Sequence, residues 1–204
     1  MARARISKER LTLLTDGLFA VVITILVLEI KPPNGTTFAD LLPLWPVALS
    51  YVISYFFIAI VWINHHHLFG YAEASSQRLV WFNFAHLFAV SLIPFTTQWV
   101  AESELGAVPV SLYAAVFLLV NLTYLALCWE VLDRAGSDAV PLRARNLLRM
   151  RSVASAIIFA IAGMAGARWP IVGMVLIVFC LVLYVRPDLP GGRSTSDVAV
   201  DNLS

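Results

Sequence analysis

Several side chains that could do chemistry lie inside or beside long apolar stretches of the chain. Asp16 lies within the first stretch, six residues after Arg10. The second stretch ends in three consecutive histidines, His65–His67, and the third carries Asn83 and His86. A carboxylate buried in lipid is costly and by default marks function. Together with imidazole groups it could coordinate a metal, move a proton, or anchor one helix to its neighbours through hydrogen bonds.

The three chemistries make different demands on geometry. Consecutive residues on an α-helix point about 100° apart, so the neighbouring histidines cannot converge on one ion. A metal site would need two helices, for example His66 and His86 together with Asp16. In an anchor, imidazole and amide groups on one face of each helix would instead satisfy Asp16 in a medium of low dielectric, and we favour this interpretation. A proton-sensing histidine is the third possibility. The residues that this argument predicts for the anchoring network are Arg10, Asp16, Trp62, His65, His66, Asn83 and His86.

The first apolar stretch also carries a stripe of bulky side chains. On a helix, Val21, Ile25 and Leu28 fall within about 60° of one another, and Thr24 lies at the edge of the same stripe. Asp16 lies about 140° from Val21 and faces away. The stripe could pack against other helices, or several copies of it could surround a pore. Apolar rings gate by narrowing and dewetting, and K⁺ sheds its hydration shell more easily than Na⁺, so such a pore would prefer K⁺ modestly.

The composition indicates an all-α integral membrane protein. The chain has 204 residues, of which 60% are hydrophobic and only 13% charged, whereas about 25% is typical of soluble domains. Its mean hydropathy is +0.81. Six segments are near the roughly 20 residues that a transmembrane helix needs. We expect a single six-helix domain over residues 1–186 and a disordered cytoplasmic tail over 187–204. The predicted spans are residues 11–30, 44–69, 77–100, 109–132, 147–167 and 169–185.

The distribution of charge predicts the orientation and excludes some partners. Of the 14 Lys and Arg residues, all but Lys31 and Arg168 lie on the side of the two termini. By the positive-inside rule, both termini are cytoplasmic in a multi-pass protein of the cell membrane. Arginines at the start of the fifth span fit a topology signal that touches anionic lipid, or a regulatory lipid site. A net charge of +1 gives no reason to expect a nucleic acid partner. We expect neither an enzyme nor a bound cofactor, because no nucleophile has a base and an orienting group at suitable spacing.

Three segments resemble a known family. Residues 10–16 read Arg-Leu-Thr-Leu-Leu-Thr-Asp and resemble the Arg-x-x-x-Phe-Ser-Asp signature of the transmembrane protein 175 type cation channels. Residues 62–66, together with Asn83 and residues 93–95, are similar to the second and third helices of that family. The resemblance covers about the first half of the chain. Leucine and threonine replace the phenylalanine and serine of the signature. Thr15 keeps the hydroxyl, so the resemblance implies that it belongs to the anchoring network as well.

The resemblance implies a homotetrameric channel with six spans in each subunit and K⁺, with other monovalent cations, as the permeant ion. In that family the first helix lines the pore. The resemblance therefore implies that the constriction is formed by Val21, Thr24, Ile25 and Leu28. Val21 stands where the family usually has isoleucine. Two alternatives stay open. One is a metal or proton-coupled transporter that uses the His and Asp residues, and the other is a membrane scaffold that transports nothing.

Overall fold

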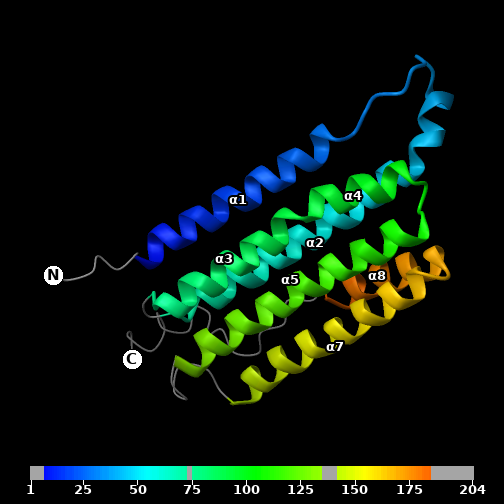
Figure 1. The fold of residues 1–204 in the computed structure, drawn as a ribbon. Helices are drawn as coiled ribbons and strands as arrows, with labels where there is room; N and C mark the ends of the chain where they lie inside the picture. Colours follow the sequence, from blue (N-terminus) through cyan, green and yellow to red (C-terminus); the bar gives the residue numbers. More distant parts are fainter. Residues whose placement is uncertain (1–6, 73–74, 135–141, 185–204) are drawn as a thin grey trace, which may run out of the picture.

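A computed structural model describes residues 7–72, 75–134 and 142–184, and these residues form helices without any strand. The predicted tail over 187–204 lies outside the described residues. The helices run roughly along one common direction in an elongated bundle (Figure 1). In chain order the elements are α1 (Lys8–Leu28), the 3₁₀ helix η1 (Phe38–Leu44), α2 (Trp45–Gly70), α3 (Gln77–Ser91), α4 (Ile93–Glu102), α5 (Ala107–Arg134), α7 (Leu142–Gly166) and α8 (Pro170–Tyr184).

The all-helical membrane architecture predicted from the sequence is confirmed. Within the described residues, five segments are long and apolar enough to cross a membrane. Two of the five combine neighbouring elements, η1 with α2 and α3 with α4. The sixth predicted span corresponds to α8, whose apolar part, Pro170–Leu183, is shorter than the other spans.

The third predicted span is not one continuous helix. The sequence predicts a single helix over residues 77–100, but α3 ends at Ser91 and α4 begins at Ile93. Pro94 lies in the first turn of α4. Proline has no amide hydrogen to donate and its ring clashes with the preceding turn, so it is tolerated where a helix starts and breaks one that runs through it. The Leu92 amide accordingly bonds to the carbonyl of Ala89, three residues back.

The core of the subunit lies among α2, α5 and α7. The rings of Phe57 and Phe117 stack with their centroids 3.7 Å apart, and Phe159 packs edge-on against both. Gly173 lets α8 approach α7 closely, since a Cβ atom there would lie 2.9 Å from the carbonyl oxygen of Ala162. This packing makes α2, α5, α7 and α8 a rigid support.

Helix α1 lies along one side of this support. It contacts α2, α3 and α4, and Figure 1 shows it at the edge of the bundle, on the far side from α7. Its N-terminus is capped by Ser7, whose hydroxyl accepts a hydrogen bond from the Arg10 amide. Its buried residues recur every three or four positions, so they form a single stripe. They are Leu11, Thr15, Phe19, Val22 and Leu26.

An ion pair lies near the other end of α1. Beyond the helix, the Lys31 ammonium lies 2.9 Å from a carboxylate oxygen of Glu102 in α4. The hydrogen bond to Glu102 and its charge raise the pKa of Lys31. Both side chains are exposed, so the pair contributes little to the stability of the fold.

Candidate pore-lining helix and its anchoring network

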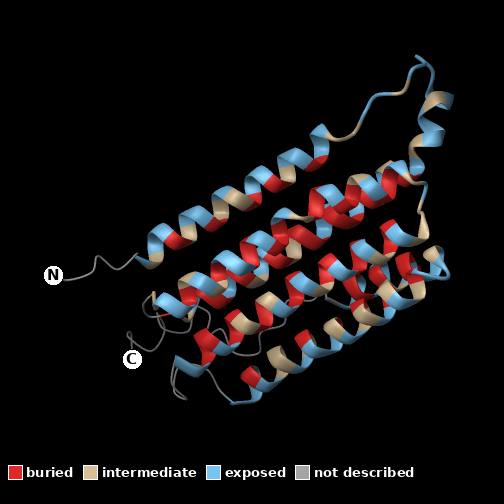
Figure 2. Ribbon diagram, in the orientation of Figure 1, coloured by how far each residue is buried: buried red, intermediate tan, exposed pale blue. Residues whose placement is uncertain are grey.

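The predicted pore stripe of α1 faces away from its own subunit. Val21 is 55% exposed, Leu28 is 79% exposed and Ile25 is 37% exposed. Thr24 is exposed as well, and its hydroxyl donates to the carbonyl of Val21 over 2.8 Å. At about 100° per residue, the centre of this stripe lies roughly 130° from the centre of the buried stripe. Figure 2 shows exposed residues along the whole of α1. The described part of one subunit therefore leaves the stripe uncovered.

A buried chain of hydrogen bonds joins the N-terminal half of α1 to its neighbours. The Asn83 amide of α3 donates to the Thr15 hydroxyl over 2.9 Å, and Thr15 donates to the carbonyl of Leu11. The Asn83 carbonyl oxygen pairs with Nε2 of His65 in α2 at 2.8 Å, so that nitrogen carries the proton. All three side chains are buried. The chain joins α1, α2 and α3 through groups that would be costly to leave unpaired.

Asp16 has a different partner from the one predicted. The sequence leads us to expect His and Asn groups around its carboxylate. Instead the indole Nε1 of Trp62 donates to Oδ1 of Asp16 over 2.8 Å. Because adjacent residues point about 100° apart, Thr15 faces the inside of the bundle and Asp16 faces its edge. The interpretation of these residues as an anchor for the helix stays a prediction, and the residue of α1 that bonds inside the bundle is Thr15.

The same rotation separates the histidines of α2. Trp62, His65 and His66 lie on one broad face of α2, within about 100° of one another, but they have different surroundings. His65 is buried and stacks on Phe69 at 4.0 Å, whereas Trp62 and His66 are exposed and stack on each other at 5.6 Å. His65 thus belongs to the interior network and His66 to the edge.

Replacing Trp62 with phenylalanine removes the bond to Asp16 and keeps the aromatic ring. We expect the free energy of unfolding to fall by about 1 kcal/mol, because Trp62 is partly exposed and water can replace part of the bond. Denaturant unfolding in detergent measures this loss. Trp81→Phe, at a more exposed tryptophan of α3, is the control. Equal losses in the two variants would show that the Asp16 bond does not contribute.

His86 joins the network through ring packing. Its side chain is fully buried, and its ring lies parallel to that of His65 with centroids 5.8 Å apart. Nδ1 lies 3.0 Å from the Thr123 hydroxyl of α5, and Nε2 has no hydrogen-bond partner among the described residues. Phe19 of α1 packs against both histidine rings. Phe19 and Thr123 were not predicted. Phe19 could have been recognised by its position four residues after Thr15.

Two arrangements considered from the sequence are absent from the described residues. Arg10 is exposed and no ion pair joins its guanidinium to the network there. No group of three His, Cys, Asp or Glu side chains that could hold a metal occurs in this part of the chain. His86 lies inside the bundle, and His66 lies on its exposed edge beside Trp62. The set of Asp16, His66 and His86 considered for a metal is therefore not assembled.

The fold and this arrangement define a helical membrane protein with several spans. Its helix α1 packs on the bundle with one face and exposes large apolar side chains on another. A family model described as the endosomal/lysosomal potassium channel TMEM175 matches residues 10–94, which include all the predicted network residues. A potassium channel from Chryseobacterium sp. (strain P1-3) is 31% identical over 183 residues, covering 89% of this chain and 94% of that protein. A potassium channel from Streptomyces collinus is 33% identical over 135 residues, covering 62% of this chain and 65% of that protein.

A solved structure has the same fold. The crystal structure of a lysosomal potassium-selective channel TMEM175 homolog from Chamaesiphon minutus matches with a TM-score of 0.77 at 24% identity, covering 87% of this chain and 96% of that one. The chain belongs to the TMEM175 family and is an integral membrane protein. The resemblance seen in its first half is thus confirmed and extends over most of its length.

Proposed function

We propose that the chain is a potassium-permeable cation channel, in which α1 from each subunit of a homotetramer lines a central pore. The observation that carries the proposal is the division of α1 into two stripes. One stripe is buried in its own subunit, and the opposite stripe exposes large apolar side chains. A relative that is named a potassium channel and is similar over 94% of its length supports the same function.

The constriction would extend over two turns of α1. Val21, Thr24, Ile25 and Leu28 span about 10 Å along the helix axis. Of these four, three offer no oxygen to an ion, and the Thr24 hydroxyl already donates its hydrogen to the Val21 carbonyl. An ion that passes therefore loses part of its hydration shell with little replacement. K⁺ loses less than Na⁺ in this step, so the selectivity for K⁺ is modest and conduction stops when the apolar rings dewet.

The network around Thr15 would set the position of the pore helix. Thr15, Asn83 and His65 fix the cytoplasmic half of α1, with Asp16 and Trp62 at its edge. We place both termini in the cytoplasm of a cell-membrane channel, because most basic residues lie on their side. Lys31 and Glu102 then hold α1 at the extracellular side, and lipid surrounds the outer helices.

Ion flux in liposomes tests the proposal directly. Purified protein should pass K⁺ down its gradient without added metal or a pH gradient. His66→Ala should leave this flux intact, whereas Ile25→Ala should change it. Flux that saturates, needs a pH gradient and disappears with His66→Ala would identify a transporter instead. If correctly folded protein passed no ions, the channel proposal would be wrong and a membrane scaffold that transports nothing would be the remaining interpretation.

The size of the first ring should tune selectivity. Val21→Ile adds one methylene group in each subunit and narrows the ring. We expect a stronger preference for K⁺ over Na⁺ and a lower conductance, because a narrower apolar ring removes more of the hydration shell. Reversal potentials in asymmetric K⁺ and Na⁺ solutions measure the ratio. An unchanged ratio would remove Val21 from the constriction.

A further inference from the structure

A buried carboxylate lies where α5 meets the start of α3. Glu130 belongs to α5, and its side chain is only 5% exposed. Its Oε1 accepts a hydrogen bond from the Ser76 hydroxyl over 2.7 Å. The same carboxyl group forms ion pairs with Arg78 in the first turn of α3 and with Arg134, four residues later on α5. Removing one member of a buried ionic group leaves the others without a partner, so this cluster ties the start of α3 to α5.

Ser76 is the N-terminal cap of α3. Its hydroxyl oxygen accepts a hydrogen bond from the Leu79 amide over 3.0 Å, while its hydrogen goes to Glu130. The first amides of a helix lack partners within the helix and carry partial positive charge, so a nearby carboxylate is favourable. Glu130 therefore orients the cap of α3 and supplies the charge that its first turn prefers.

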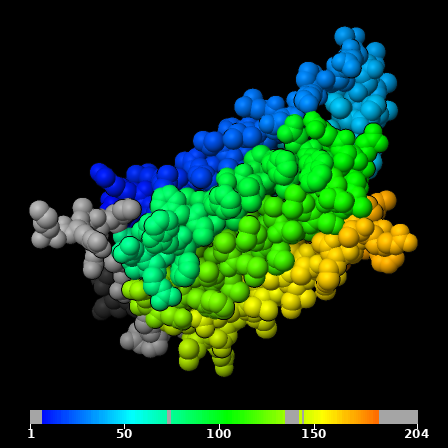
Figure 3. All heavy atoms as spheres, viewed as in Figure 1, coloured from blue at the N-terminus to red at the C-terminus, as the bar shows by residue number. Residues whose placement is uncertain are grey.

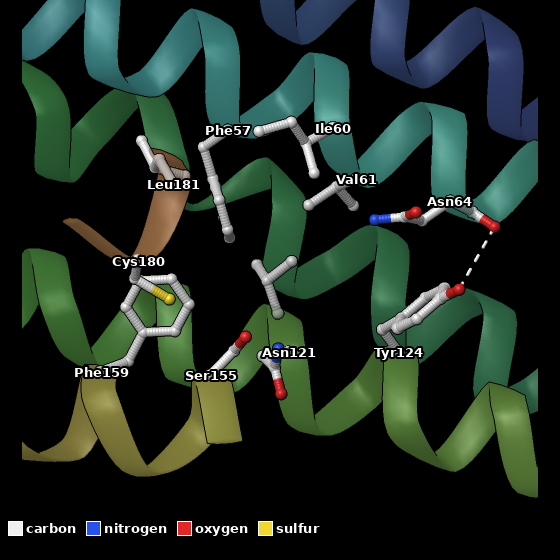
Figure 4. Close-up of a pocket in the computed structure, with 11 residues that line it drawn as sticks. Phe57, Ile60, Val61, Asn64, Asn121, Tyr124, Ser155, Phe159, Cys180 and Leu181 are labelled. Atoms are coloured by element: carbon white, nitrogen blue, oxygen red, sulfur yellow. Dashed lines mark hydrogen bonds between the residues drawn. The ribbon is translucent and has the colours of Figure 1, made fainter. Parts of the chain in front are cut away.

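The helix that carries Glu130 is itself fixed to the rest of the subunit. Figure 4 shows Tyr124 of α5, whose hydroxyl donates to the backbone carbonyl of Asn64 in α2 over 3.2 Å. Further along α5, Phe117 stacks on Phe57 of α2. The same helix contacts α7 and α8. Glu130 thus offers α3 a fixed point on the rigid part of the bundle.

Helix α3 lies between this fixed point and α1. Figure 1 and Figure 3 show α3 side by side with α1 and with α5, and it contacts both. Asn83, which donates to the Thr15 hydroxyl of α1, follows the Ser76 cap by about 10 Å along the helix axis. A shift or rotation at the start of α3 would therefore move the Asn83 amide relative to Thr15.

We propose that Glu130 is a positioning residue for α1. By fixing the cap and the first turn of α3, it brings Asn83 into register with Thr15. Glu130 lies in the second half of the chain, outside the residues that the family model matches. The inference rests on the proposed function only in taking α1 as the helix that lines the pore.

The coupling between Thr15 and Asn83 tests this role. It is the difference between the summed stability losses of Thr15→Val and Asn83→Leu and the loss of the double variant, measured by denaturant unfolding of the full-length protein in detergent. Glu130→Met keeps the length of the side chain and removes its charge and oxygen atoms. In this background the coupling should fall at least twofold. A general loss of stability would lower all four unfolding free energies alike and leave the coupling unchanged, and an unchanged coupling would overturn the proposal.

Asp133→Leu is the matched control. Asp133 is a second acidic residue of α5, but its partner is Arg149 of α7, so the coupling should stay at its wild-type value. Ser76→Ala keeps the carboxylate and should lower the coupling as Glu130→Met does, and it replaces that variant if Glu130→Met does not fold. Equal reductions in the Asp133→Leu and Glu130→Met backgrounds would overturn the proposal.

Ion permeation connects the position of α1 to the pore. In planar bilayers, Glu130→Met should change the K⁺ to Na⁺ permeability ratio at least twofold, whereas Asp133→Leu should leave it unchanged. A reduced coupling with an unchanged ratio would overturn the link between Glu130 and the pore. If the wild-type protein passes no ions, the proposed function fails, and the coupling measurement still decides whether Glu130 positions α1.

Discussion

Ile25→Asn is expected to raise the conductance of the channel several-fold and to bring its K⁺ to Na⁺ permeability ratio to about one. Ile25 is the member of the stripe nearest the subunit's own packed face, with 37% of its surface exposed, so its position is the best fixed. An amide at this ring offers oxygen and nitrogen atoms to water and ions. The ring would then stay wet, and neither ion would need to lose its shell there. Reversal potentials and single-channel currents in planar bilayers measure both effects.

The matched control for this prediction is Val27→Asn. Val27 is 49% exposed and lies two residues from Ile25, which is about 160° around the helix. The same polar side chain there should leave the permeability ratio near the wild-type value. If Val27→Asn removed selectivity as Ile25→Asn does, the pore would not be lined by one stripe of α1.

Hydropathy and helical periodicity were enough to predict the fold. Lipid leaves the backbone few alternatives to a helix, so segments of about 20 apolar residues specify their structure almost alone. The break at Leu92 was missed because hydropathy is continuous across it. Pro94 was visible in the sequence, but proline inside a transmembrane helix can kink it as well as end it. Only the packing of α3 and α4 decides between these outcomes.

The anchoring network was predicted by residue type more accurately than by pairing. Buried polar side chains in apolar helices must find partners, and this argument selected Asn83 and His65, whereas Thr15 was selected by the resemblance to the channel signature. Neither argument could select Thr15 over Asp16 as the inner residue. That choice depends on the rotation of α1 against α2 and α3, which the large buried residue Phe19 helps to fix. Periodicity likewise identified the outer stripe of α1, but it does not say what covers that stripe.

Asn83→Leu is expected to lower the free energy of unfolding by about 1–3 kcal/mol, because it leaves a buried hydrogen-bond donor unpaired. Asn83 is the only link between Thr15 and His65 among the described contacts. Without it, the Nε2 hydrogen of His65 has no partner in a place that water does not reach. Unfolding by denaturant in detergent, followed by tryptophan fluorescence, measures the loss.

The same substitution at an exposed site separates this effect from side-chain size and polarity. Asn146→Leu lies on the outside of α7 and should change stability by less than about 0.5 kcal/mol. Combining Asn83→Leu with Thr15→Val then tests whether the two residues act together. Since both changes break one bond, their joint effect should be smaller than the sum of the separate effects. Strict additivity, or equal losses at the buried and the exposed asparagine, would mean that this network does not hold α1 in place.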